Sequence, residues 1–291
     1  MFSILQKREL APEIFLVEVE APRIAKSARP GQFVIVRAHE RGERIPLTIA
    51  GYDAQRGTIL MVIQAIGVST RRMQAMSVGD AFADVAGPLG QPSEFATMPD
   101  AELQQQRLLF IAGGVGAAPI LPQVEEFHRR GAHVEVILGA RNANLLILRN
   151  ELQRSCNALH LTTDDGSAGR KGLVTDMLNE LVASGNRYTH VITIGPMVMM
   201  KFVARAAKAL GLPAIASLNT LMVDGTGMCG ACRVTVGGQT RFTCVDGPEF
   251  DAHQVDFDEA LRRLSMYKTQ EGQRLREAEQ RGHICKIGRN S

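Results

Sequence analysis

The sequence contains no tryptophan, and aromatic residues make up only 5% of its 291 positions. Proteins that bind single-stranded nucleic acid stack bases on aromatic side chains, so this composition offers little for such a surface. Basic residues form no block, and 33 basic against 30 acidic residues leave a net charge of only +3. We therefore expect no nucleic-acid partner.

Long apolar segments are also missing. The longest apolar run, Leu108–Pro122, is interrupted by glycines and is too short to cross a bilayer. The first residues lack the basic and apolar regions of a signal peptide. Three of the five cysteines lie in one motif, which suits a reducing compartment better than a disulfide framework. We expect a cytoplasmic protein that does not enter a membrane.

The most informative motif lies near the C-terminus. Asp224, Cys229, Cys232 and Cys244 are spaced as D-x4-C-x2-C-x11-C. Plant-type ferredoxins hold a [2Fe–2S] cluster with C-x4-C-x2-C and one distant cysteine, so Asp224 stands at the first ligand position. Glycines between the ligands would let the backbone wrap closely around a cluster. We predict an iron–sulfur module over residues 219–250.

Other interpretations of this motif stay open. Three clustered cysteines are also compatible with a structural zinc site or with reduced thiols in a core. The fourth ligand is a second open point, because Cys285 or His253 could fold back to the cysteines. We favour Asp224, since neither alternative has a fixed spacing from the motif.

The first hundred residues predict a small antiparallel β-barrel, residues 1–98. Residues 13–20, 32–38 and 58–66 are rich in Val, Ile and Phe, and turn residues rather than helical periods separate them. The segment Arg44-Ile-Pro46-Leu47-Thr48 places a guanidinium, a rigid proline and a hydroxyl at a strand edge. Gly67-Val-Ser69-Thr70 is expected to open a helix, Ser69–Met76, whose amides could hold a phosphate.

Residues 99–218 alternate between strand-like and helix-like patterns, which predicts a doubly wound parallel sheet. Ligands of such sheets bind at the carboxyl ends of the strands. Glycine-rich turns follow several of these strands, and we predict that they bind a nicotinamide nucleotide. The expected strands are Arg107–Ala112, His133–Leu138, Ala158–Thr163, Thr189–Ile194 and Ala214–Leu218, and the helices are Pro119–Arg130, Leu173–Ser184 and Met197–Leu210. The candidate binding residues are Gly113, Gly114, Gly116, Ala117, Pro119, Gly139, Arg141, Asp164, Asp165, Gly166, Gly195, Pro196 and Met199.

The sequence leaves NADH and NADPH open. Arg141, Arg170 and Lys171 could hold a 2′-phosphate, whereas Asp164 and Asp165 would repel one. The tail, residues 251–291, contains an apolar stripe at helical spacing made by Phe257, Leu261 and Leu264. This tail could pack on its own domain or dock a partner, and the pattern does not distinguish the two.

The two motifs of the barrel together resemble the flavin-binding domain of the ferredoxin–NADP reductase superfamily. The resemblance implies FAD, with Arg44 at its pyrophosphate and Thr48 beside the isoalloxazine. It also implies that Leu47 and the strand Ile63-Gln64-Ala65 line the flavin, with Gly67, Ser69 and Thr70 at the pyrophosphate. The nucleotide motifs Gly113–Pro119 and Gly195–Met200 are similar to the second half of the same superfamily, and the resemblance leans to NADH.

Barrel, nucleotide domain and cluster module, in this order, resemble the electron-transfer subunits of dihydroorotate dehydrogenase type 1B. They are also similar to the small subunits of NADH-dependent reduced ferredoxin:NADP oxidoreductase, and Asp224 in place of a fourth cysteine favours these. The resemblance implies that NAD(H) or NADP(H) exchanges a hydride with FAD and that a [2Fe–2S] cluster carries single electrons. No protein acid or base is required, so we name no catalytic residue.

The expected partner is a larger, glutamate-synthase-like flavoprotein with iron–sulfur centres, which would connect the chain indirectly to ferredoxin. Three alternatives stay open. The chain could serve a dihydroorotate dehydrogenase, act as a self-contained NAD(P)H reductase, or be a non-catalytic redox sensor.

Overall fold

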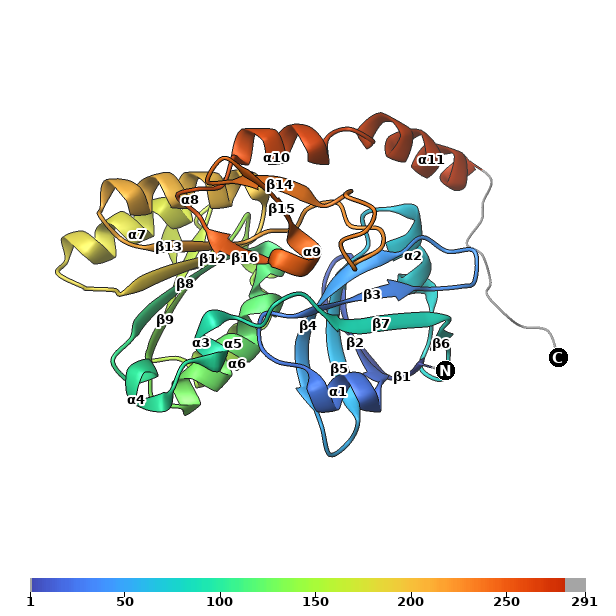
Figure 1. Cartoon of the computed structure of the whole chain (residues 1–291), viewed down its shortest axis with the longest axis horizontal. Helices are drawn as coiled ribbons and strands as arrows, with labels where there is room; N and C mark the ends of the chain where they lie inside the picture. Colours follow the sequence, from blue (N-terminus) through green and yellow to red (C-terminus); the bar gives the residue numbers. More distant parts are fainter. Residues whose placement is uncertain (1, 281–291) are drawn as a thin grey trace.

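The computed structural model describes residues 2–280, which begin with the first strand of a barrel. Two seven-stranded sheets form the body of the molecule, and a two-stranded hairpin lies beside them (Figure 1). None of the helices in the described part of the chain is long and apolar enough to span a bilayer. The predicted combination of a barrel, an α/β domain and a C-terminal module is confirmed.

The first sheet is the antiparallel barrel, in the order β6-β1-β2-β5-β4-β3-β7. Inward-facing Phe15, Val34 and Met61 are buried in its core, as period-2 alternation requires. Helix α2 (Val68–Ala75) closes one end, and α1 (Pro22–Ser27) packs on the other side. The strands are β1 (Phe2–Ala11), β2 (Ile14–Glu20), β3 (Phe33–Arg37), β4 (Ile45–Asp53), β5 (Thr58–Gln64), β6 (Ala81–Phe82) and β7 (Asp84–Leu89).

The second sheet has the order β11-β10-β9-β8-β12-β13-β16 and is parallel except for its last strand. Helices α7 and α8 cover one face and α5 and α6 the other, as Figure 1 shows. Its strands are β8 (Arg107–Gly113), β9 (His133–Ala140), β10 (Ala158–Thr163), β11 (Arg170–Lys171), β12 (His190–Ile194), β13 (Ala214–Ser217) and β16 (Glu249–Asp251). Its helices are α3 (Glu94–Thr97), α4 (Asp100–Leu103), α5 (Ala117–Arg129), α6 (Arg149–Ser155), α7 (Val174–Ala183) and α8 (Met197–Ala209), with 3-10 turns η1 (Gly114–Gly116) and η2 (Ala143–Leu145).

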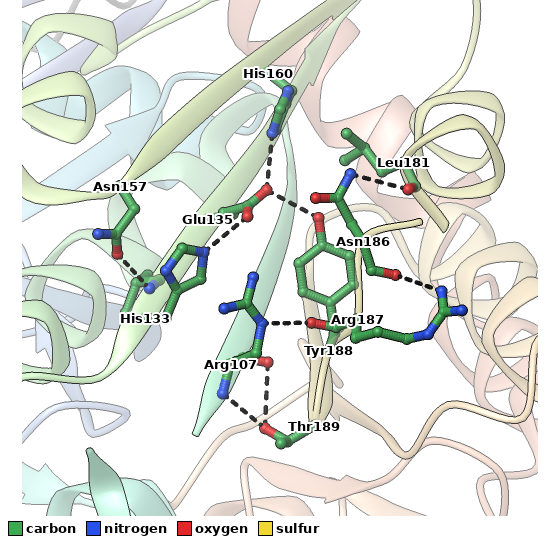
Figure 2. Close-up of polar contacts among 11 residues, drawn as sticks. Arg107, His133, Glu135, Asn157, His160, Leu181, Asn186, Arg187, Tyr188 and Thr189 are labelled. Carbon is green, nitrogen blue, oxygen red and sulfur yellow. Dashed lines mark hydrogen bonds and ion pairs between the residues drawn. The ribbon is translucent and has the colours of Figure 1, made fainter. Parts of the chain in front are cut away.

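A buried carboxylate, Glu135, lies in the amino half of β9 and contacts side chains of neighbouring segments (Figure 2). Glu135 of β9 lies 2.8 Å from His133 Nε2 and 3.0 Å from His160 Nε2, and the Tyr188 hydroxyl donates to it at 2.8 Å. The hydrogen bond from His160 is the main reason that the pKa of Glu135 falls to about 2, although burial opposes the shift. With three hydrogen-bond partners, this buried carboxylate avoids the cost of an unsatisfied buried charge.

The C-terminal segment joins both sheets. It contains the hairpin of β14 (Arg233–Val236) and β15 (Gln239–Phe242), then α9 (Thr243–Asp246), α10 (Phe257–Leu264) and α11 (Lys268–Gln280). Helix α10 packs on α8 and β14, so this part of the tail covers its own domain. The apolar stripe is narrower than predicted, because Phe257 and Ala260 are buried whereas Leu264 is exposed. Helix α11 reaches the barrel, where Glu279 pairs with Arg71 at 2.6 Å.

Candidate functional site

The residues predicted to hold FAD gather on two neighbouring strands of the barrel. Strand β4 begins directly after Arg44, and its Pro46–Thr48 stretch is partly exposed opposite β3, with Thr48 paired to Phe33. Ile63 on β5 and Ala65 directly after this strand are fully buried in the barrel core, so only their backbone could face a flavin. Gln64, between them, is partly exposed and is the side chain of this trio that can reach a ligand.

Helix α2 has the capping expected of a phosphate-binding turn. The Gly67 amide donates to Thr70 Oγ1 at 3.0 Å, which closes the first turn of the helix. The Ser69 hydroxyl is bonded to the Glu43 carboxylate, whose charge competes with any anion at this position. The Thr70 hydroxyl also donates to the Gly67 carbonyl at 3.2 Å, so the backbone amides at the start of the helix offer the better contacts for a pyrophosphate.

The glycine-rich turn after β8 lies at the carboxyl end of the parallel sheet, against the flavin strand β5. A Cβ atom on Gly116 would lie 2.3 Å from the Ile194 carbonyl oxygen, so this glycine is required for packing on β12. Gly114 has φ +57° and would place a Cβ atom in open space. Gly114 therefore belongs to the side of the turn that a nucleotide can approach.

The neighbouring strand ends are packed in the same way. Gly139 allows the Val174 side chain of α7 to pack against the backbone of β9, since a Cβ atom on Gly139 would lie 2.3 Å from that side chain. The Met199 thioether covers Gly113 and Gly195, with its sulfur 2.5 Å from the Cβ position of Gly113. Met197 and Met200 are core residues of α8. These positions shape the sheet edge, and Met199 is the partly exposed methionine of the run.

Charged groups near the third strand end favour a nucleotide without a 2′-phosphate. Asp164 and Asp165 are exposed, and Ser167 donates to Asp165 from its hydroxyl at 2.6 Å, which lowers the pKa of that carboxyl. Arg170, a candidate partner for a 2′-phosphate, instead pairs with Glu180 at 2.6 Å and Asp176 at 3.6 Å. Of the basic candidates, Arg141 and Lys171 are exposed.

Two of the predicted cluster ligands already lie side by side. Cys232 and Cys244 are buried with their sulfurs 3.2 Å apart, and burial together with this hydrogen bond raises the pKa of Cys244 to about 12. They belong to a small apolar cluster that also contains Phe33 and Ile35 of the barrel. Cys229 is exposed on the loop above them.

Asp224 orders the same loop through its side chain. Its carboxylate accepts hydrogen bonds from the Thr226 hydroxyl at 2.7 Å and from the Met228 and Cys229 amides at 3.1 and 3.4 Å. The bond from Thr226 is the main cause of a lowered pKa, so Asp224 is anionic at neutral pH. In residues 2–280 no three metal-ligating side chains converge closely enough to form a finished site.

The donor set nevertheless fits an iron–sulfur cluster. Gly225, Gly227 and Gly230 all have positive φ, so the loop already turns tightly around its ligands. Cys229 is on this exposed loop, next to the anionic Asp224. The alternative ligand His253 is held at the Leu212 carbonyl, 2.9 Å from its Nε2. Cys285 lies outside the described residues.

Arg44 has contacts that the sequence did not predict. Its Nε donates to the Val223 carbonyl at 2.9 Å and its Nη2 to the Asp224 carbonyl at 3.3 Å, while Nη1 lies 3.4 Å from Asp84. The guanidinium expected at the flavin pyrophosphate thus also ties the barrel to the cluster loop.

Known protein families match two of these regions. The model of the iron-sulfur cluster binding domain of dihydroorotate dehydrogenase B matches residues 219–256, and that of the oxidoreductase NAD-binding domain matches residues 110–205. A Thermotoga maritima protein named dihydroorotate dehydrogenase B (NAD(+)), electron transfer subunit homolog is 44% identical, over 92% of each chain. The chain belongs to this family of electron-transfer subunits. A Clostridium beijerinckii relative described only as an uncharacterized protein is 54% identical, over 96% of this chain and 95% of its own.

One solved structure is similar to this chain over nearly the whole length of both. It belongs to an NADH-dependent reduced ferredoxin-NADP oxidoreductase studied for flavin-based electron bifurcation. It is 40% identical, covers 96% of this chain and 98% of its own, and has a TM-score of 0.87. The family matches and the reductase fold support FAD, an iron–sulfur cluster and NAD(H) as cofactors of this oxidoreductase subunit. They favour the iron–sulfur interpretation of the cysteine motif over zinc or core thiols.

Proposed function

We propose that this chain is a conduit for electrons between NADH, FAD and a [2Fe–2S] cluster, and that the cluster exchanges them with a larger flavoprotein subunit. NADH would bind at the glycine-rich strand ends, FAD at Arg44–Thr48, Ile63–Ala65 and Gly67–Thr70, and the cluster at Asp224, Cys229, Cys232 and Cys244. FAD supplies the step from hydride to single electrons. The chain's own residues bind and orient the three groups.

The observation that carries this proposal is the meeting of all three candidate sites at the barrel. The turn η1 lies against the flavin strand β5. On the other side, the cluster loop rests on β3 and β7, where a Cβ atom on Gly225 would lie 2.6 Å from Ile35 and 2.8 Å from Leu89. Since β3 pairs with β4, the loop is one strand away from Thr48. Such proximity suits consecutive electron transfers.

The domain limits follow from the same arrangement and are part of the proposal: flavin barrel 1–98, nucleotide domain 99–218, cluster module 219–250 and tail 251–291. Strand β16 crosses the last limit, because it adds to the edge of the nucleotide sheet. A cytoplasmic location is likewise a proposal from the cysteine usage.

The partner we favour is glutamate-synthase-like, as in a ferredoxin:NADP oxidoreductase. The 40% identical structure of such an enzyme and the aspartate at position 224 support this choice. The second candidate is a dihydroorotate dehydrogenase, which the names of several relatives support. Affinity purification of the full chain from its native cell, followed by identification of the co-purifying flavoprotein, distinguishes the two.

Nucleotide choice gives a direct test of the first electron-transfer step. In anaerobic stopped-flow measurements, NADH should bleach the bound flavin much faster than NADPH, because Asp164 and Asp165 repel a 2′-phosphate and Arg170 is already paired. Equal rates, or a preference for NADPH, would contradict this assignment. A chain purified without flavin that cannot be reconstituted with FAD would contradict the function itself.

A further inference from the structure

Two arginines from distant parts of the sequence donate hydrogen bonds to the cluster loop, residues 218–232. Arg44, just before β4, donates to the carbonyls of Val223 and Asp224 at 2.9 and 3.3 Å. Arg263, on the tail helix α10, donates through Nη2 to the Ala231 carbonyl at 3.1 Å. The two guanidinium groups therefore hold the loop at its middle and near its C-terminal end.

The loop depends on such support. It contains neither helix nor strand between β13 and β14, and its backbone turns through positive φ at Gly225, Gly227 and Gly230. Glycine-rich backbone loses much conformational entropy on ordering, so an unsupported loop would sample many arrangements. Carbonyls that accept from arginine point toward positive charge, which restricts the orientation of the neighbouring peptide units.

Arg263 is placed for this contact by the packing of α10. Phe257 and Ala260, on the buried face of the helix, fix it on α8 and β14. This leaves Arg263 half-buried beside the loop, whereas its neighbour Arg262 is exposed. Arg262 carries the same charge on the same helix, but within residues 2–280 its side chain donates no hydrogen bond to the loop.

We propose that Arg263 is a positioning residue for the iron–sulfur cluster: with Arg44, it restricts the conformation of the loop that carries the proposed ligands and places positive charge beside an anionic cluster. The inference rests on the proposed binding of the cluster by this loop. Nearby positive charge favours the reduced cluster, which carries one more electron, so it raises the reduction potential. A tail helix would thus tune a redox centre that it does not ligate.

The test uses Arg263→Ala, Arg263→Lys and the matched control Arg262→Ala in the full-length chain with its cofactors. Arg263 is preferred to Arg44 because it lies outside the proposed flavin site, so flavin content should stay at the wild-type level. In EPR-monitored redox titrations, Arg263→Ala should shift the cluster potential to more negative values. Arg263→Lys should recover part of the shift, and Arg262→Ala should leave the potential unchanged. Equal potentials for wild type and Arg263→Ala, or equal shifts for both alanine variants, would overturn the proposal.

A second measurement covers loss of the cluster. If Arg263→Ala purifies without iron, amide hydrogen exchange is compared across residues 218–232 in apo wild type and apo variant. Faster exchange confined to this loop supports the positioning role, and unchanged or globally faster exchange contradicts it. Wild-type protein that takes up no iron would refute the proposed function. The role of Arg263 in ordering the loop would still be tested in that case, because the exchange comparison uses apo protein.

Discussion

Asp224, the proposed fourth cluster ligand, also orders the loop that contains it. Its carboxylate now accepts hydrogen bonds from Thr226, Met228 and Cys229, all within the loop that it would help to close around iron. The Thr226 hydroxyl bonds to Oδ1 and the two amides bond to Oδ2, so as an iron ligand Asp224 would bind through an oxygen that accepts hydrogen bonds within the loop. A carboxylate is a harder and less electron-donating ligand than thiolate, so it should leave a distinct electronic signature.

Substitutions at this position separate ligation from loop closure. Asp224→Cys should retain a [2Fe–2S] cluster with changed EPR g-values and reduction potential, because ligand identity controls both. Asp224→Asn loses the anionic ligand and keeps a single oxygen acceptor, which can replace either Oδ1, the acceptor for the Thr226 hydroxyl, or Oδ2, the acceptor for the Met228 amide. We therefore expect a labile cluster on a loop that keeps part of its hydrogen bonding. Iron and sulfide content with EPR spectra checks both expectations.

The control for that series is Cys285→Ser, which should change neither metal content nor spectrum. If Cys285→Ser removes iron while Asp224→Ala leaves the EPR signal intact, the fourth ligand is the cysteine and Asp224 serves only the loop.

At the scale of elements, two glycines of the turn η1, Gly114 and Gly116, are required for different physical reasons. The sequence suggests that a side chain at Gly114 or Gly116 would obstruct a dinucleotide. The structure shows open space around the Cβ position of Gly114, where we propose that the dinucleotide approaches. It shows a packing requirement at Gly116, whose Cβ position is 2.3 Å from a backbone oxygen of β12.

Alanine at each position should therefore give different phenotypes. Gly116→Ala forces β12 and the turn apart, which should cost about 1–3 kcal/mol of folding free energy, as overpacking does. Gly114→Ala has room for its methyl group and carries only the strain of positive φ, about 1–2 kcal/mol. We expect Gly114→Ala to stay folded with weaker NADH binding, and Gly116→Ala to lower the melting temperature further. Thermal unfolding and NADH titration of both variants measure this, and a Gly116→Ala variant as stable as Gly114→Ala would disprove the packing role.

The strong periodic elements of the chain were predictable, and the irregular ones were not. Parallel strands such as β8 and β9 are continuous apolar runs between helices, and the structure confirms them. For β4 the sequence indicates only a strand edge at Arg44–Thr48, because Pro46 and Gly51 are typical of turns. It does not predict β1, because apolar and charged residues do not alternate regularly over Phe2–Ala11. The three-residue strand β16 leaves too short a pattern to detect.

For the candidate site, local motifs predicted positions but not contacts between distant segments. The spacing of the cysteines is a local pattern, and Cys232 and Cys244 do meet. The bonds from Arg44 to Val223 and from Arg263 to Ala231 join segments 179 and 32 residues apart. Such contacts depend on how the module docks on the barrel and on α10, and one sequence carries no signal for that.

At the scale of the whole molecule, the barrel is the common support of the three candidate sites. A shared apolar core joins it to the nucleotide domain, with Leu16 and Val62 of the barrel in one cluster with Phe110 and Phe127. A second small core, including Phe33, Met222 and Cys244, joins it to the cluster module. Buried apolar contacts on two sides hold the sites in a fixed geometry, so electron transfer along the chain needs no large domain movement.

The most direct measurement of this account is freeze-quench EPR of the isolated chain, loaded with FAD and iron–sulfur cluster and mixed anaerobically with NADH. The account predicts rapid flavin bleaching followed by the signal of a reduced [2Fe–2S] cluster, and it predicts that removal of FAD abolishes the signal. A cluster that stays oxidised while the flavin is fully reduced, at a potential low enough to reduce it, would contradict a flavin-to-cluster conduit within this chain. So would a cluster that NADH reduces equally fast without FAD.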